Sequence, residues 1–392
     1  MRVTAIYEEL RSRKKLRLER FPVSAILAAQ LTLTIVLPAY LKGTQPFSLM
    51  LAICVVAVAG AFYVECVTLG WNARPRRPVQ TSVGAANVVL LTGAAASLGA
   101  ALGGQGSYAV QIGRAQVSPI VALLAPFTAW LLFGAALYMW LYREGVVSRR
   151  RALATLAAAS AIQLIIGIER AILGQAVALV ASLMVMAIFA RLIRFRTLVI
   201  LLLLLPILWP PIYQYRNTLR EELAGSSVYV GLDGPMDRLQ MDEQMAVVER
   251  LVPKPDYLVA PSLTTLIRTG LIPSAIDPNR PAIDTGAKMN QALGGTALSS
   301  TSATMMGNVY IFSGLLAVGA VSAALALGMR IALRRSSPWA LSATGLIYLN
   351  GMSSNAAYPD IVPRLLQGGA SLLIAFVLVR AVDRGRAEHD RS

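Results

Sequence analysis

Long apolar runs alternate with short basic segments along most of the chain, and this pattern predicts a series of membrane-spanning helices. The runs are roughly 17 to 25 residues long, which suits a hydrocarbon layer of about 30 Å. They must be helical, because backbone groups in lipid need hydrogen-bond partners within their own segment. The two-residue alternation of an outer-membrane barrel does not occur in the sequence. We expect an all-α polytopic membrane protein with ten spans, near residues 22–41, 46–70, 82–103, 118–141, 152–168, 171–190, 197–213, 307–329, 338–352 and 365–381.

One polar interval interrupts this pattern and divides the chain into four parts. Residues 1–213 carry a basic N-terminal segment and seven spans, and residues 214–306 form one large loop. Residues 307–381 carry three more spans, followed by a tail over residues 382–392. Function is expected in the large loop, because long connections in compact proteins usually carry it.

The basic residues predict the orientation of the chain in the membrane. About two thirds of the 36 Lys and Arg residues fall in the segments that ten spans place on the same side as the N-terminus, and the positive-inside rule assigns that side to the cytoplasm. We therefore expect a bacterial inner-membrane protein with both termini cytoplasmic and the large loop periplasmic. The formal net charge of +16 is scattered in short clusters, so a nucleic-acid partner is not expected.

Composition excludes a soluble domain. Hydrophobic residues make up 56% of the chain and charged residues 14%, whereas a soluble domain has about 25% charged residues. Cys54 and Cys66 lie in one apolar run and should be about 18 Å apart along a helix, too far for a disulfide. Glu65 is the one acidic residue within a span, and we expect its side chain to reach the nearby interface.

The large loop carries half of the 20 acidic residues and two predicted helices. Met241, Met245, Val248 and Val252 recur at spacings of four, three and four, which predicts an amphipathic helix lying on the membrane surface. A second helix is expected to run from Ser262, as its N-cap, through Arg268 to a stop at Gly270. The following prolines, in LIPSAIDPNRPAIDTG (271–286), predict a stiff extended segment at the edge of the bundle.

Arginines at the outer boundary of the predicted bundle suit a diphosphate, because the guanidinium fork binds phosphate oxygens in pairs and stays charged. The alternative is that such arginines bind phospholipid headgroups or pair with nearby acids. The candidates for diphosphate binding are Arg216, Arg238, Arg268, Arg280 and Arg364.

Histidine limits the acid–base chemistry that the outer face could use. The single histidine, His389, lies in the expected cytoplasmic tail, so a periplasmic general base must be a carboxylate or none is used. Asp237 and Glu243 are the candidates. The acids of the predicted surface helix are too spread out for a paired carboxylate metal site, so we expect a reaction without a metal or another cofactor.

The loop resembles a known family of membrane enzymes. IPSAIDPNRP, then Gly286, a Ser/Thr-rich run and GNVYIFSGLLAVG, is similar to the Wzy-type polymerases that assemble bacterial O-antigen and exopolysaccharide from oligosaccharide repeat units. MDRLQMDEQMAVVERLVP resembles the surface helix of that family. The resemblance covers roughly residues 210–320. Ser274 departs from it, because the family often has an arginine there, whereas Arg280 keeps a second basic position.

The resemblance implies a transferase with an architecture like that of the GT-C polymerases and ligases. It would move a glycan from one polyprenyl diphosphate carrier to an incoming lipid-linked repeat unit, with arginines holding the diphosphates and Tyr310 and Tyr358 contacting sugar. Expected partners are polyprenyl-diphosphate-linked oligosaccharides and membrane lipids. A chain-length regulator and a flippase of the same pathway are possible further partners.

Three other functions fit the same pattern of spans. An O-antigen ligase is a related transferase, but that family is thought to use an outer-loop histidine. A lipid-linked oligosaccharide flippase or other transporter would need charges inside the bundle, and the spans have very few. A scaffold subunit of an export complex would leave the loop charges without a chemical role.

Overall fold

The computed structural model describes residues 22–69, 81–111, 115–117, 121, 123–171, 173–224, 241–272, 276–277, 279, 285–295, 303–334, 337–353, 358 and 361–389. These residues form helices and connecting turns, with no strand among them. The helices are α2 (Pro22–Leu31), α3 (Leu37–Lys42), α4 (Phe47–Val67), α5 (Val83–Leu102), α6 (Tyr108–Gln111), α8 (Ala125–Thr128), α9 (Trp130–Arg143), α10 (Arg149–Glu169), α11 (Leu173–Phe189), α12 (Phe195–Ala224), α13 (Asp242–Arg250), α14 (Leu263–Leu271), α15 (Thr285–Ala292), α16 (Thr304–Arg334), α17 (Pro338–Ile347) and α18 (Ile361–His389). Two π-helical turns, η1 (Thr32–Val36) and η3 (Tyr348–Met352), continue α2 and α17.

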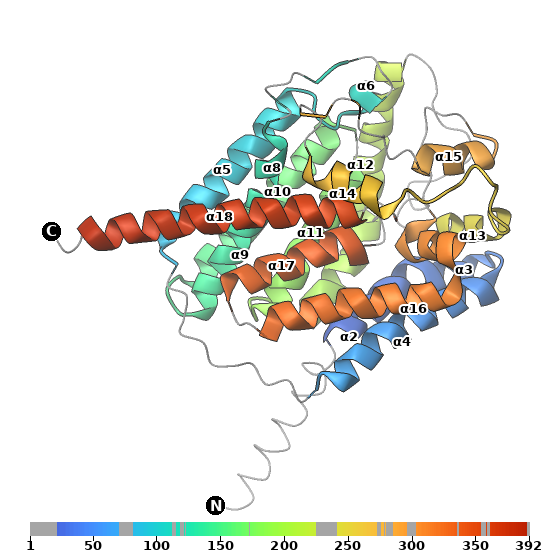
Figure 1. The fold of residues 1–392 in the computed structure, drawn as a ribbon, viewed down its shortest axis with the longest axis horizontal. Coiled ribbons are helices and arrows are strands. Elements are labelled where there is room, and N and C mark those ends of the chain that lie inside the picture. Colours follow the sequence, from blue (N-terminus) through green and yellow to red (C-terminus); the bar gives the residue numbers. More distant parts are fainter. Residues whose placement is uncertain are drawn as a thin grey trace, which may run out of the picture.

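The structure confirms an all-helical polytopic membrane protein. Seven helices in the described part of the chain are long and apolar enough to cross a membrane. The remaining predicted spans, 171–190, 197–213 and 338–352, coincide with α11, α12 and the α17–η3 pair. Figure 1 shows α18 extending across the bundle, with α14 beside the start of that helix.

The helices pack closely through small residues. At the contact between α4 and α16, a Cβ placed on Gly60 would lie 2.3 Å from the carbonyl oxygen of Gly319. Only a residue without a side chain therefore lets these two backbones touch, as is common where helices associate in lipid. The many Ala and Gly residues of these spans thus serve helix packing.

The predicted span over residues 307–329 is not one continuous helix. Gly314 has φ 78° and ψ −178°, so α16 consists of two helices joined at this residue. The hydroxyl of Ser322 lies 3.5 Å from the sulfur of Met306, although sixteen residues of straight helix would separate them by about 24 Å. Residues 304–313 therefore fold back along residues 315–334 and form a re-entrant helix inside the bundle.

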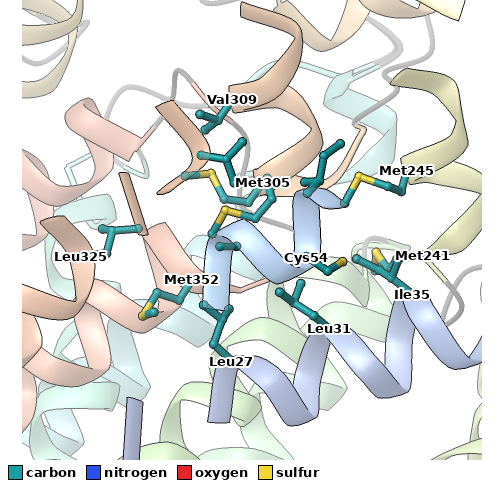
Figure 2. Packing of buried hydrophobic residues seen from close by; sticks show 14 of the residues in the cluster. Leu27, Leu31, Ile35, Cys54, Met241, Met245, Met305, Val309, Leu325 and Met352 are labelled. Carbon is teal, nitrogen blue, oxygen red and sulfur yellow. The ribbon is translucent and has the colours of Figure 1, made fainter. Parts of the chain in front are cut away.

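The amphipathic helix of the large loop faces protein rather than lipid. Met241, Met245 and Val248 are buried in the main apolar core, and α13 contacts α3, η1, α4 and α16. Figure 2 shows Met241 and Met245 beside Ile35 and Cys54. The predicted periodicity was right for these three residues, whereas Val252 lies beyond the end of α13 and is exposed. The expectation of a surface-lying helix was wrong, because the same apolar face that suits lipid also suits a protein core.

The two ends of the bundle can be named from their contacts. At the basic end, Arg330 of α16 binds the last turn of α4 through Thr68, and Arg149 of α10 binds the carbonyl of Leu192 after α11. At the opposite end, here called the loop end, α13 lies beside α3 (Figure 1). This separation of basic and mixed charge agrees with the predicted distribution of cations.

Glu65 lies near the basic end but does not reach the interface. Its carboxylate is fully buried and accepts hydrogen bonds from Val23 N (2.8 Å), Ser24 N (3.2 Å) and the Ser24 hydroxyl. These donors belong to the first turn of α2, whose N–H groups have no partner within that helix. Glu65 therefore caps a distant helix, and the expectation of an interfacial side chain was wrong.

Candidate functional site

A charged cluster at the loop end joins α3 to α13. The Lys42 Nζ lies 3.4 Å from Glu243 Oε1 and 3.9 Å from Asp242 Oδ1. Asp242 is 0% exposed, and its Oδ2 accepts a hydrogen bond of 2.6 Å from the Thr44 hydroxyl. We call Lys42, Thr44, Asp242 and Glu243 the α3–α13 cluster.

Local backbone geometry positions this cluster. The η1 turn leaves the carbonyl of Thr34 directed at α13, where it accepts a hydrogen bond of 2.6 Å from the backbone N–H of Met241. Asp242 and Glu243 follow directly as the first turn of α13, where carboxylates interact favourably with the helix dipole. The π-helical turn and the helix start together bring two carboxylates to the end of α3.

The re-entrant helix presents aromatic residues next to a second lysine. The Lys254 Nζ lies 5.7 Å from the ring centroid of Phe312, and the Phe312 ring lies 5.8 Å from that of Tyr358. Tyr310 and Tyr358 are half-buried and pack against the main core. Of the two predicted sugar-contacting tyrosines, Tyr310 thus lies on the re-entrant helix and Tyr358 packs beside it.

Arg268 is held by an acid nine residues further along the chain. Its Nε and Nη2 donate to the two carboxylate oxygens of Asp277 at 2.5 and 2.8 Å, and hydrogen bonding, followed by charge, from Asp277 raises the pKa of the guanidinium. The side chain of Arg268 is still 46% exposed. The predicted N-cap of this helix is confirmed, because the Ser262 hydroxyl accepts from Thr265 N at 3.2 Å.

Arg364 lies close to this pair in the fold. It belongs to α18, which packs against α14, and Gln367 donates a hydrogen bond of 3.2 Å to the carbonyl of Thr269. Two of the predicted diphosphate ligands, Arg268 and Arg364, are therefore carried by adjoining helices.

Arg216 belongs to a different surrounding. It lies on α12, is 5% exposed, and places its guanidinium carbon 4.4 Å from the ring centroid of Tyr213. Its Nε and Nη2 also donate to the side-chain oxygen of Asn217, at 3.2 and 2.7 Å. Tyr213 belongs to a small apolar cluster with Leu173 and Trp209, separate from the core beneath the α3–α13 cluster.

The remaining predicted site residues, Asp237, Arg238 and Arg280, lie outside the residues that the structure describes. The structure adds Lys42, Asp242 and Lys254, which sequence reasoning had not assigned to the site. Their signal in the sequence is weak, because a lysine after a span and an acid at a helix start are common features whose contacts depend on the fold.

The described residues were expected to hold no metal ion and contain few potential ligands near one another. No group of three or more His, Cys, Asp or Glu side chains is arranged there to hold a metal ion. Cys54 and Cys66 are both unpaired, as their spacing predicted.

Comparison with protein-family models, with curated proteins and with solved structures finds no match for this chain.

Proposed function

We propose that the protein polymerises lipid-linked oligosaccharide repeat units, by glycosyl transfer from a polyprenyl diphosphate carrier at the outer face of the bacterial inner membrane. The proposal includes ten spans, cytoplasmic termini and a periplasmic loop end. It includes the architecture of the GT-C polymerases and ligases as well.

The observation that carries the proposal is the position of the segment on which the resemblance rests. GNVYIFSG (307–314) forms most of the re-entrant helix, which packs on α13 and ends beside Lys254 and Tyr358. Backbone that turns back within a membrane is tolerated where it is buried in protein or lines a cavity, and such segments often carry function. The segment thus brings aromatic side chains beside Lys254 and packs on α13, the helix that carries Glu243, at the end of the bundle where a lipid headgroup would lie.

The proposed reaction needs a base, a leaving group and charge neutralisation. The acceptor sugar hydroxyl attacks the anomeric carbon of the donor glycan, and the bond from that carbon to the diphosphate oxygen breaks with its electron pair going to the diphosphate. Glu243 or Asp237 takes the hydroxyl proton, while Arg216, Arg238, Arg268, Arg280 and Arg364 stabilise diphosphate charge. Asp242 is buried and positions Lys42 beside Glu243.

The test is the length of the surface glycan in a strain deleted for this gene. Wild type, Glu243→Gln, Arg268→Gln and Glu249→Gln would be expressed at matched levels, and the glycan would be resolved by gel. Glu249 is the matched control, because it is an exposed glutamate on the same helix. We expect single repeat units in the deletion strain, and a polymerisation rate reduced about 10²- to 10⁴-fold in Glu243→Gln if it is the base. Glu249→Gln should restore full length.

A transporter of lipid-linked oligosaccharides is the second candidate, and the broken α16 helix favours it. Discontinuous helices at membrane depth are typical of transporter binding sites. Loss of the transporter would leave repeat units on the cytoplasmic face, whereas loss of the polymerase leaves single units exposed outside. Full-length glycan in the deletion strain would contradict the polymerase, and long glycan left on its carrier would indicate a ligase.

A further inference from the structure

A second group of buried polar atoms lies at the end of α10, apart from the α3–α13 cluster. Arg170 is the C-cap of α10, and its Nε and Nη2 are buried without a hydrogen-bond partner among the described residues. Its backbone carbonyl accepts from Tyr108 N at 3.0 Å, which ties the turn after α10 to α6. Two of the three nitrogens of this guanidinium are thus buried, yet they bind none of the described residues.

The hydroxyl of Tyr213 is a second buried polar group, and Tyr213 packs against residues close to Arg170 in sequence. Its side chain is 3% exposed, and its hydroxyl is buried without a hydrogen-bond partner in the described part of the chain. Tyr213 packs in one apolar cluster with Leu173 and Ile168, which flank Arg170 in sequence on either side. The guanidinium of Arg216 lies over the ring of Tyr213. Arg216 therefore contacts this buried phenol, and the residues on either side of Arg170 in sequence pack in the same apolar cluster.

A glycine turn borders the Arg170 guanidinium. Gly104 and Gly106 have φ of 76° and 69°, values that side chains rarely adopt. A Cβ on Gly106 would lie 3.8 Å from Arg170 Nη1, so the backbone of this turn passes close to the charged group. The turn leaves room beside the guanidinium that bulkier residues would fill.

The electrostatics favour an anion in this place. Burial lowers the pKa of Arg170, but an arginine stays protonated in proteins because its ordinary pKa lies far above neutral pH. A buried cation is stable only when it is paired or hydrogen-bonded. Neighbouring donors of one guanidinium form a fork that matches two oxygens of one phosphate group, and a phenol adds a third donor.

We propose that Arg170, Tyr213, Arg216 and the turn around Gly106 form a binding site for the phosphate or diphosphate group of a lipid. The turn after α5 and the end of α10 meet here beside α12, towards one end of the bundle (Figure 1), where headgroups of a surrounding bilayer would lie. The site shares Arg216 with the proposed glycosyl transfer and adds Arg170, Tyr213 and the Gly106 turn, and a transporter would equally need to hold a lipid phosphate. The proposed function enters only in naming a polyprenyl diphosphate as one possible natural ligand.

Binding to the purified full-length protein tests the proposal. Inorganic pyrophosphate, phosphatidylglycerol and a polyprenyl diphosphate would be titrated separately, with bound ligand counted by native mass spectrometry from detergent micelles. The variants are Arg170→Gln, Arg170→Lys and Tyr213→Phe. Arg143→Gln is the matched control, because Arg143 also stacks on an aromatic ring, that of Trp140, but at the basic end.

We expect Arg170→Gln to weaken binding of at least one probe about 10- to 100-fold, which corresponds to losing hydrogen bonds to a charged group. Tyr213→Phe removes only the hydroxyl and should weaken the same probe about fivefold. Arg170→Lys should lie between Arg170→Gln and wild type, because lysine keeps the charge without the fork. Arg143→Gln should bind as wild type does.

The three probes separate the possible sources of the phosphate. Binding of pyrophosphate and the polyprenyl diphosphate identifies a diphosphate site, whereas binding of phosphatidylglycerol alone identifies a site for bilayer headgroups. The proposal is overturned if wild type retains none of the probes, or if Arg170→Gln and Tyr213→Phe both bind as wild type does. If Arg170→Gln fails to fold, Tyr213→Phe decides. An unchanged glycan in the deletion strain would overturn the polymerase and leave this binding result standing.

Discussion

The basic end and the loop end of the bundle use their charged residues in opposite ways. At the basic end, Arg330 and Arg149 donate to groups at the ends of neighbouring helices, and Arg143 stacks on a ring of its own helix. At the loop end, Lys42 faces two carboxylates, and Arg268 holds a third. Arg330 and Arg149 at the basic end thus bind groups at helix ends. Lys42 and Arg268 at the loop end form ion pairs with carboxylates.

This difference teaches that the charge of a residue near a membrane does not by itself indicate its role. A helix C-terminus carries partial negative charge, so an arginine there is satisfied without an acid. Lys42 and Arg268 at the loop end instead have acids placed opposite them by other segments of the chain. We therefore expect substitutions at the basic end to act on stability alone and those at the loop end to act on activity as well.

The largest effect is expected from Glu65, a buried acid near the basic end. Glu65→Ala removes the acceptor of the Val23 and Ser24 backbone N–H groups, and should lower the free energy of unfolding by about 3 kcal/mol, because buried donors are left without partners. Unfolding of the purified protein in mixed micelles measures it. Glu144→Ala, an exposed glutamate at the same end, is the control and should change little. Equal losses of stability in the two variants would show that the buried contacts of Glu65 do not stabilise the protein.

A smaller loss of stability is expected from the buried acid of the loop end. Asp242→Ala leaves the Thr44 hydroxyl without its acceptor and removes one carboxylate from Lys42. We expect a loss of about 2 kcal/mol in the free energy of unfolding, since Lys42 keeps Glu243 as a partner. The same unfolding assay measures it, and the glycan assay should show lost polymer. Full activity in a destabilised Asp242→Ala protein would show that this cluster is purely structural.

Arg330 at the basic end should contribute to stability but not to activity. Arg330→Gln removes hydrogen bonds of 3.1 Å to the hydroxyl and the carbonyl of Thr68, and should cost about 1 kcal/mol. Arg150→Gln, an exposed arginine in the first turn of α10, is its control. Glycan length should match wild type for both variants. A shortened glycan in Arg330→Gln would mean that the basic end also contributes to activity.

The smallest effect on stability is expected where the proposed effect on activity is large. Glu243→Gln breaks an exposed ion pair with Lys42, and such pairs contribute about 0.5 kcal/mol that salt screens further. The unfolding free energy should therefore stay near that of wild type at high salt, while polymerisation is lost. If stability and activity fall together, Glu243 is a structural residue and Asp237 remains the candidate base.

Much of the fold follows from the sequence, but the site follows from it only in part. The apolar runs predicted the helices, yet the same runs gave no sign that residues 304–313 fold back, because a single glycine within an apolar stretch is compatible with a straight helix. Arg268 was predicted as a cation of the site, but its bidentate contact with Asp277 depends on where the fold places Asp277 relative to α14. Lys42 was not predicted as a residue of the site.

The sequence by itself determined the features that depend on near neighbours and on solvent. Apolar segments become membrane helices because lipid offers no partner for the backbone, and Ser262 caps α14 because its hydroxyl reaches an N–H three residues away. Tertiary structure alone decided that α13 faces the core, that Glu65 caps α2, and that Asp242 is buried beside Lys42. Each of these depends on which surfaces meet between residues far apart in the chain, and neither periodicity nor charge specifies that partner.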